Sequence, residues 1–95
     1  MNFTYSRAFD VHIMLGLLVT VNYTGHLCES QIFDEDPSFD IEVDSLDSFE
    51  IKGTKYLIKE LDPVIQEYLF DRAYRDADKN LNKIIAQKEM LLNQL

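Results

Sequence analysis

Nine carboxylates follow one another between residues 29 and 50 with no lysine or arginine among them. They are Glu29, Asp34, Glu35, Asp36, Asp40, Glu42, Asp44, Asp47 and Glu50. Alternate residues of a strand share a face and lie about 6.8 Å apart, so Asp40, Glu42 and Asp44 are expected to form a row of negative charge. Successive phosphates along a DNA strand lie on the order of 6 to 7 Å apart through space. The row therefore predicts a surface that occupies a lysine- and arginine-lined groove built for a phosphate backbone.

The partner expected from this chemistry is a protein with a basic nucleic-acid-binding groove. A net charge of −8 repels nucleic acid and anionic membranes, so neither is expected as a direct partner. The partner-binding residues predicted in this way are Asp34, Glu35, Asp36, Asp40, Glu42, Asp44 and Asp47.

The same carboxylates have a simpler interpretation, as a solvated face that only keeps the protein soluble. The distribution of charge bears on this choice. The whole charge of −8 lies in residues 1–62, because residues 63–95 carry five acidic and five basic side chains. A chain under no functional constraint is expected to intersperse lysines among so many acids. The segregation therefore favours a binding surface, and the solubility face stays open as the alternative.

Clustered acids also bind calcium, but the spacing here departs from the calcium-loop motif. A loop starting at Asp34 has Asp36 and Ser38 at its third and fifth positions. Phe39 then replaces the glycine at the sixth position, and Ser45 replaces the bidentate glutamate at the twelfth. We therefore predict no calcium site of this type, with weak divalent-ion binding by the loop carboxylates as an alternative.

Zinc binding and nucleophilic catalysis lack the residues that they require. His26 and Cys28 would supply two zinc ligands, yet the sequence has only one further histidine, His12, and no second cysteine. Cys28 beside a histidine resembles a nucleophile and base, but no oxyanion element is recognisable. The three glycines stand apart at positions 16, 25 and 53, so no phosphate-binding loop is present. We expect no metal, no cofactor and no enzymatic activity.

Length and composition indicate how many domains the chain forms and in which kind of compartment it folds. Ninety-five residues, 46% of them hydrophobic, amount to a single folded domain over residues 1–95. The lone cysteine cannot form an internal disulfide, which is typical of a reducing compartment such as the cytoplasm. The most apolar stretch, residues 11–21, contains His12 and Gly16 and is too short to span a bilayer. No membrane segment is expected.

Period-two alternation of apolar and polar residues predicts the strands of the acidic part, residues 1–62. Two strands, at about 2–14 and 17–25, are expected to form a hairpin that turns at Gly16, followed by a surface loop over residues 26–38. A third strand starts at Phe39 with an apolar face and an acidic face. Residues 45–48 are expected to bend it, and Phe49 and Ile51 continue the apolar face towards Gly53.

A helix is predicted to start after Asp62, a favourable N-cap, with Pro63 at its first position. Because residues 64–95 contain neither glycine nor proline, one helix running from 63 to about 93 would be roughly 46 Å long. A compact body of 62 residues would span only about 27 Å, so the helix should overhang it. The expected fold is α+β, with a three- or four-stranded antiparallel sheet packed by one long C-terminal helix.

The distal part of this helix carries apolar residues at alternating spacings of three and four, which is the pattern of a coiled-coil seam. Homodimerisation through this seam is one interpretation. The other is that the helical segment folds back over its own sheet or breaks in the polar stretch from Asp76 to Asn80. The dimer-interface residues predicted by the first interpretation are Tyr74, Ala77, Leu81, Ile84 and Leu91.

The arrangement of these segments looks like that of small acidic bacteriophage-encoded accessory proteins of the anti-CRISPR and anti-restriction type. The resemblance extends over the stretches 9–13, 19–23, 34–37 and 39–43 and the closing helix, and it gives no site residue individually. It implies a stoichiometric inhibitor of a bacterial defence complex that acts in the host cytoplasm. The alternative function is a non-enzymatic assembly or dimerisation module that uses the C-terminal helix.

Overall fold

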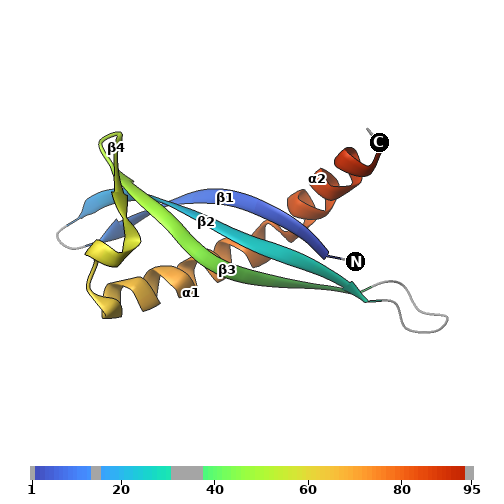
Figure 1. Cartoon of the computed structure of the whole chain (residues 1–95), viewed down its shortest axis with the longest axis horizontal. Coiled ribbons are helices and arrows are strands. Elements are labelled where there is room, and N and C mark those ends of the chain that lie inside the picture. Colours follow the sequence, from blue (N-terminus) through green and yellow to red (C-terminus); the bar gives the residue numbers. More distant parts are fainter. Residues whose placement is uncertain (1, 14–15, 31–37, 94–95) are drawn as a thin grey trace.

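A computed structural model of the chain describes residues 2–13, 16–30 and 38–93 (Figure 1). Four antiparallel strands form one sheet in the order β1-β2-β3-β4, so each strand pairs with the next along the chain. The strands are β1 (Asn2–Ile13), β2 (Leu17–Ser30), β3 (Ser38–Ile51) and β4 (Thr54–Leu57). A 3-10 turn, η1 (Ile58–Glu60), leads to the helices α1 (Pro63–Lys79) and α2 (Leu81–Asn93). The α+β class and the antiparallel sheet are confirmed, and the sheet has four strands.

β1 and β2 pair without interruption from Asn2 opposite Cys28 to Ile13 opposite Leu17. Gly16 lies just before β2 with a φ of 79°, a backbone conformation that suits glycine. The predicted hairpin is therefore confirmed, but the predicted loop over residues 26–38 is wrong in its first part. β2 continues to Ser30 because Leu27 is fully buried between its partners Phe3 on β1 and Ile41 on β3.

β3 runs through residues 45–48, where a bend was expected. Its pairing with β2 shifts register twice, so that Asp44 and Asp47 each lack a partner on β2. A bulge adds one residue to a strand and lets pairing resume beyond it. The two bulges explain the spacing of the inward-facing residues Val43, Leu46 and Phe49, which are three apart rather than two.

Gly25 allows a close approach at the centre of the sheet. The ring of Tyr5 crosses over it, and the Tyr5 hydroxyl donates a 2.9 Å hydrogen bond to the backbone oxygen of Glu42. A Cβ atom at position 25 would lie 2.1 Å from that oxygen and 2.5 Å from the Tyr5 hydroxyl. A side chain at this position would therefore force the strands or the ring to move.

The helix starts where the sequence predicts, because Asp62 caps it by accepting a 2.8 Å hydrogen bond from the backbone nitrogen of Val64. The prediction of one long helix is wrong. α1 ends at Lys79, and Asn80 separates it from α2. The Asn80 side chain donates to the backbone oxygen of Asp76 over 2.7 Å, and this contact ends the first helix. Neither helix of the described residues is long and apolar enough to cross a membrane.

The core lies between one face of the sheet and the helices. Leu69, Ala73 and Ala77 form the buried stripe of α1, and Ile84 of α2 joins the same core. The molecule measures 51 × 27 × 20 Å. Strands of 14 residues are about 46 Å long, so the sheet itself runs along most of the molecule. The expectation of a helix overhanging a compact 27 Å body is therefore wrong.

Candidate functional site

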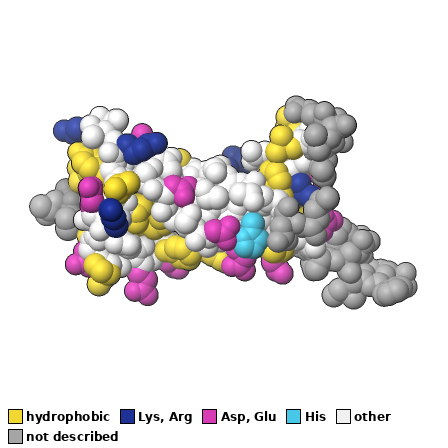
Figure 2. Space-filling view, viewed as in Figure 1, with side chains coloured by type: hydrophobic (Ala, Val, Ile, Leu, Met, Phe, Trp, Pro, Cys, Tyr) yellow, Lys and Arg dark blue, Asp and Glu magenta, His cyan; other side chains and the backbone are white. Residues whose placement is uncertain are grey.

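One face of the sheet is not covered by α1 or α2, the two helices of the described residues. The strand residues that point towards α1 and α2 are largely buried, whereas their neighbours on the other side are exposed or half-buried. We call this second side the open face. Acidic side chains are prominent over the middle and lower part of the view in Figure 2, where a histidine lies against acidic side chains. The charged and hydrogen-bonding residues of the open face used below are Asp10, Thr20, Asn22, Thr24, His26, Asp40, Glu42, Asp44, Asp47 and Glu50.

The two bulges of β3 raise the density of carboxylates on the open face. Strict alternation would place one residue in two on this side of the strand. Alternation alone places Asp40, Glu42 and Asp44 on this side, and the bulges add Asp47; all four side chains are exposed. Four acidic side chains therefore lie within eight residues on one side of β3.

Polar side chains of the central strand β2 hold carboxylates from both of its neighbours. Thr20 donates to Asp10 of β1 over 2.6 Å, and Thr24 donates to Asp47 of β3 over 2.6 Å. Since each acceptor oxygen has a fixed donor, the negative charges are held in place rather than free to move apart.

Two further side chains of β2 contact carboxylates of β3 on the open face. His26 Nδ1 lies 2.7 Å from a carboxylate oxygen of Asp44, and Asn22 donates to Glu50 over 3.3 Å. Asp40 and Glu42 lie across from Cys28 and His26 in the register of the sheet. The carboxylate side chains of Asp40 and Glu42 are exposed to solvent.

Four of the predicted partner-binding residues are brought together by the fold. Asp40, Glu42, Asp44 and Asp47 share the open face, whereas Asp34, Glu35 and Asp36 lie outside the described residues. Sequence reasoning missed the contribution of Asp10 and of the central strand. The available signal was the run of polar side chains at alternate positions of β2, namely Thr20, Asn22, Thr24 and His26.

Glu29 belongs to the nine consecutive acids but not to the open face. Its carboxylate pairs with Lys88 of α2 at 2.5 Å, and Lys88 also lies over the ring of Phe39. Lys88 is only 7% exposed. The pair anchors α2 to the ends of β2 and β3, which explains why a lysine occurs within the apolar pattern of the helix.

The predicted dimer seam is divided by the fold. Ala77 and Ile84 are fully buried in the core of this chain, and Leu81 packs against the same cluster. Tyr74 and Leu91 remain exposed, at 41% and 46%. The break at Asn80 turns the seam towards the chain's own sheet, so these five residues do not form one surface stripe. Their placement as a continuous interface is therefore wrong for the structure described.

Asp76 connects α1 to the inward face of the sheet. One of its carboxylate oxygens accepts from the Tyr23 hydroxyl over 2.6 Å and from Arg7 Nε over 3.1 Å. Burial, and next the hydrogen bond to Asp76, raise the pKa of Tyr23 well above its ordinary value. Burial, and next the charge of Asp44, raise the pKa of Tyr5 to about 12. These groups stabilise the fold rather than face a ligand.

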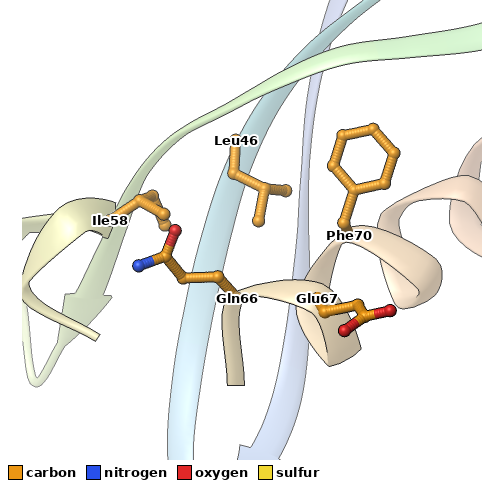
Figure 3. A pocket seen from close by; sticks show the side chains of 5 residues that line it. All are labelled: Leu46, Ile58, Gln66, Glu67 and Phe70. Atoms are coloured by element: carbon orange, nitrogen blue, oxygen red, sulfur yellow. The ribbon is translucent and has the colours of Figure 1, made fainter. Parts of the chain in front are cut away.

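Two hollows on the helix side are open and mainly apolar. Figure 3 shows the one between β3, η1 and α1, of about 360 Å³, where Leu46 and Phe70 point into the space and Glu67 lies at its rim. Another, of about 440 Å³, has His12 and Tyr68 at its edge. Among the residues that the structure describes, no three His, Cys, Asp or Glu side chains are grouped to hold a metal ion.

Comparison with protein-family models, with curated proteins and with solved structures gave no match to this chain. The function is therefore inferred from the surface of the molecule itself.

Proposed function

We propose that this protein binds a basic groove of a partner protein through the open face and keeps nucleic acid out of that groove. The observation that carries the proposal is the set of carboxylates held by the central strand, including Asp10, Asp44 and Asp47. Lysine and arginine side chains placed to meet phosphates meet carboxylates by the same electrostatics.

The fixed geometry of these charges supports binding rather than solubility alone. Acids that only keep a protein soluble gain nothing from being held in place, and like charges side by side cost stability. A pre-organised set loses less conformational freedom when a partner binds. Asp40 and Glu42 extend the held set along β3 towards the start of the strand. The open face is thus suited to a flat or concave basic surface.

In a bacterial host this activity is that of an anti-CRISPR-like inhibitor, a phage-type protein that blocks a defence complex without catalysis in the host cytoplasm. The resemblance in segment order to small acidic phage proteins supports this narrower proposal. The inhibitor needs no cofactor, because occupation of the groove is sufficient to exclude nucleic acid.

The test compares two variants of equal charge. Asp40→Lys with Glu42→Lys changes the open face, and Glu67→Lys with Asp78→Lys changes exposed residues of α1. Each pair alters the net charge from −8 to −4, since each substitution adds two charges. Tagged wild type and both variants are used for affinity capture from bacterial lysate, and captured complexes are then challenged with competing double-stranded DNA.

We expect wild type and the α1 variant to capture the same nucleic-acid-binding protein, and DNA to displace it. The open-face variant should capture at least about tenfold less, as expected for charge reversal at an electrostatic interface. Equal capture by both variants would refute the proposed mechanism.

A second candidate function, assembly through α2, is favoured by one observation. Met90 and Leu91 are exposed at 63% and 46% near the end of that helix. The variant Leu91→Ser distinguishes the two functions, because it should abolish capture if α2 is the interface and leave capture intact if the open face is.

A further inference from the structure

β1 is a long edge strand with an unpaired side. It has 12 residues and lies first in the sheet, and no described strand pairs with its outer edge. Proteins commonly protect such edges with proline, lysine or a bulge. β1 contains neither proline nor lysine, and its register with β2 is continuous. Its backbone is therefore available to accept another strand.

A groove with positive charge runs beside this edge. It has a volume of about 420 Å³ and lies between β1 and α1, with Phe9 in its lining. Arg72, Arg75 and Lys79 line it from the helix. They are spaced by three and four residues, so they share one flank of α1 over about 10 Å. This is a basic stripe in a protein whose net charge is −8.

The acidic residues of the groove are already engaged. Asp76 accepts from Tyr23 and Arg7, and Asp10 accepts from Thr20. Arg75 pairs with Asp71 at 3.2 Å. Within the part of the chain that the structure describes, Arg72 and Lys79 have no carboxylate partner. The positive charges of Arg72 and Lys79 are therefore available to an acidic ligand.

We propose that this groove binds an extended acidic segment of a partner protein, which adds to β1 as a fifth strand. Such a strand lies about 4.8 Å from β1, and its alternate side chains point to the helix side with a spacing of about 6.8 Å. Two or three acidic side chains at alternate positions then span the same length as the stripe. The groove shares Asp10 with the open face. The proposed contacts are with the backbone of β1 and the stripe on α1, so this proposal does not depend on the function proposed for the open face.

A second copy of this chain is a poorer occupant of the same edge. Antiparallel pairing of two β1 strands around a two-fold axis would bring two stripes of Arg72, Arg75 and Lys79 towards each other. Like charges placed in this way oppose association. Charge complementarity therefore favours an acidic segment.

The first test uses a fluorescent peptide of alternating valine and glutamate, with fluorescence anisotropy as the measurement. We expect Arg72→Glu with Lys79→Glu to weaken binding at least about tenfold. Lys52→Glu with Lys59→Glu is a matched exchange at exposed residues on either side of β4, the strand at the other edge of the sheet. It should leave binding within about twofold. Equal loss in both variants would show attraction to net charge alone and would overturn the proposal.

The second test addresses the backbone contacts and uses only wild-type protein. A peptide methylated at alternate backbone nitrogens cannot form the ladder of a fifth strand, so it should lose binding. Hydrogen exchange of β1 amides should slow when the unmodified peptide binds. Unchanged binding of the methylated peptide would contradict strand addition. A dimer in sedimentation equilibrium that excludes the peptide would assign the edge to a second copy and would also overturn the proposal.

Discussion

At the scale of single residues, the hydroxyl groups of two buried tyrosines join separate elements: Tyr5 joins β1 to β3, and Tyr23 joins β2 to α1. Tyr5 and Tyr23 are almost fully buried, and their rings pack edge to face. The Tyr5 hydroxyl donates a hydrogen bond to the backbone oxygen of Glu42, and the Tyr23 hydroxyl donates one to a carboxylate oxygen of Asp76. Ionisation of either phenol would place a negative charge beside Asp44 or Asp76. The native state therefore keeps both phenols protonated above the pH at which an exposed tyrosine ionises.

This arrangement predicts a loss of stability in alkaline solution. Unfolded tyrosine has a pKa of about 10, and that of Tyr5 in the folded protein is about 12. Above pH 10 the unfolded chain releases phenol protons that the native state retains, so the free energy of unfolding falls as the pH rises through this interval. The slope is at most about 1.4 kcal/mol per pH unit for each tyrosine. Urea denaturation at several pH values between about 9 and 12 measures this slope.

The matched control is an exposed tyrosine. Tyr5→Phe removes one buried phenol and should reduce the slope, whereas Tyr68→Phe, at a residue that is 48% exposed, should leave it unchanged. A slope that is the same in both variants would contradict the prediction. The comparison is made between slopes, because the loss of the hydrogen bond to Glu42 also lowers stability at every pH.

At the scale of elements, local signals predicted the starts of strands and helices better than their continuation. The alternation at Phe39, Ile41 and Val43 and the cap at Asp62 depend on neighbouring residues only, and both are confirmed. The two bulges of β3 depend on the pairing with β2, which no short stretch of sequence encodes. The shared open face of Asp40 and Glu42 and the alternating polar residues of β2 were therefore predictable from the sequence. The contacts that the β2 residues make with Asp44 and Asp47 were not.

The break between the helices is the clearest case in which a tertiary contact outweighs helix propensity. The stretch from Asp76 to Asn80 contains no glycine or proline, so propensity alone allows one helix. Asn80 instead bonds to the backbone oxygen and the carboxylate of Asp76, which is itself held by Tyr23. The turn at Asn80 directs Ile84 into the core.

The sign of one stability change tests this account. Alanine has the higher helix propensity by roughly 0.5 kcal/mol, so Asn80→Ala would stabilise a continuous helix. We expect it to destabilise this protein by about 1 kcal/mol, because the bonds to Asp76 are lost. Asn82→Ala, at an exposed position within α2, should stabilise by a few tenths of a kcal/mol. Urea denaturation followed by circular dichroism measures both, and a stabilising Asn80→Ala would contradict the account.

At the scale of the whole molecule, the structure separates charge by surface. The open face carries the carboxylates of β1 and β3, whereas the flank of α1 beside β1 carries Arg72, Arg75 and Lys79. Residues 63–95 have no net charge, so the whole charge of −8 lies in residues 1–62. The repulsion between like charges therefore lowers stability mainly in the sheet. Holding carboxylates together on one face opposes folding, since like charges across a sheet are destabilising.

This cost predicts that neutral residues on the open face increase stability. Asp40→Asn with Glu42→Gln should raise the free energy of unfolding by about 0.5 to 1 kcal/mol at low ionic strength. Glu67→Gln with Asp78→Asn, which remove two charges from α1, should change it by less than about 0.5 kcal/mol. The gain should disappear in about 1 M salt, where charges are screened beyond about 3 Å. Urea denaturation at low and high salt measures it, and a gain that persists at high salt would have another cause. If Asp40→Asn with Glu42→Gln also abolishes binding to the partner protein, the two carboxylates contribute to binding and lower the free energy of unfolding at the same time.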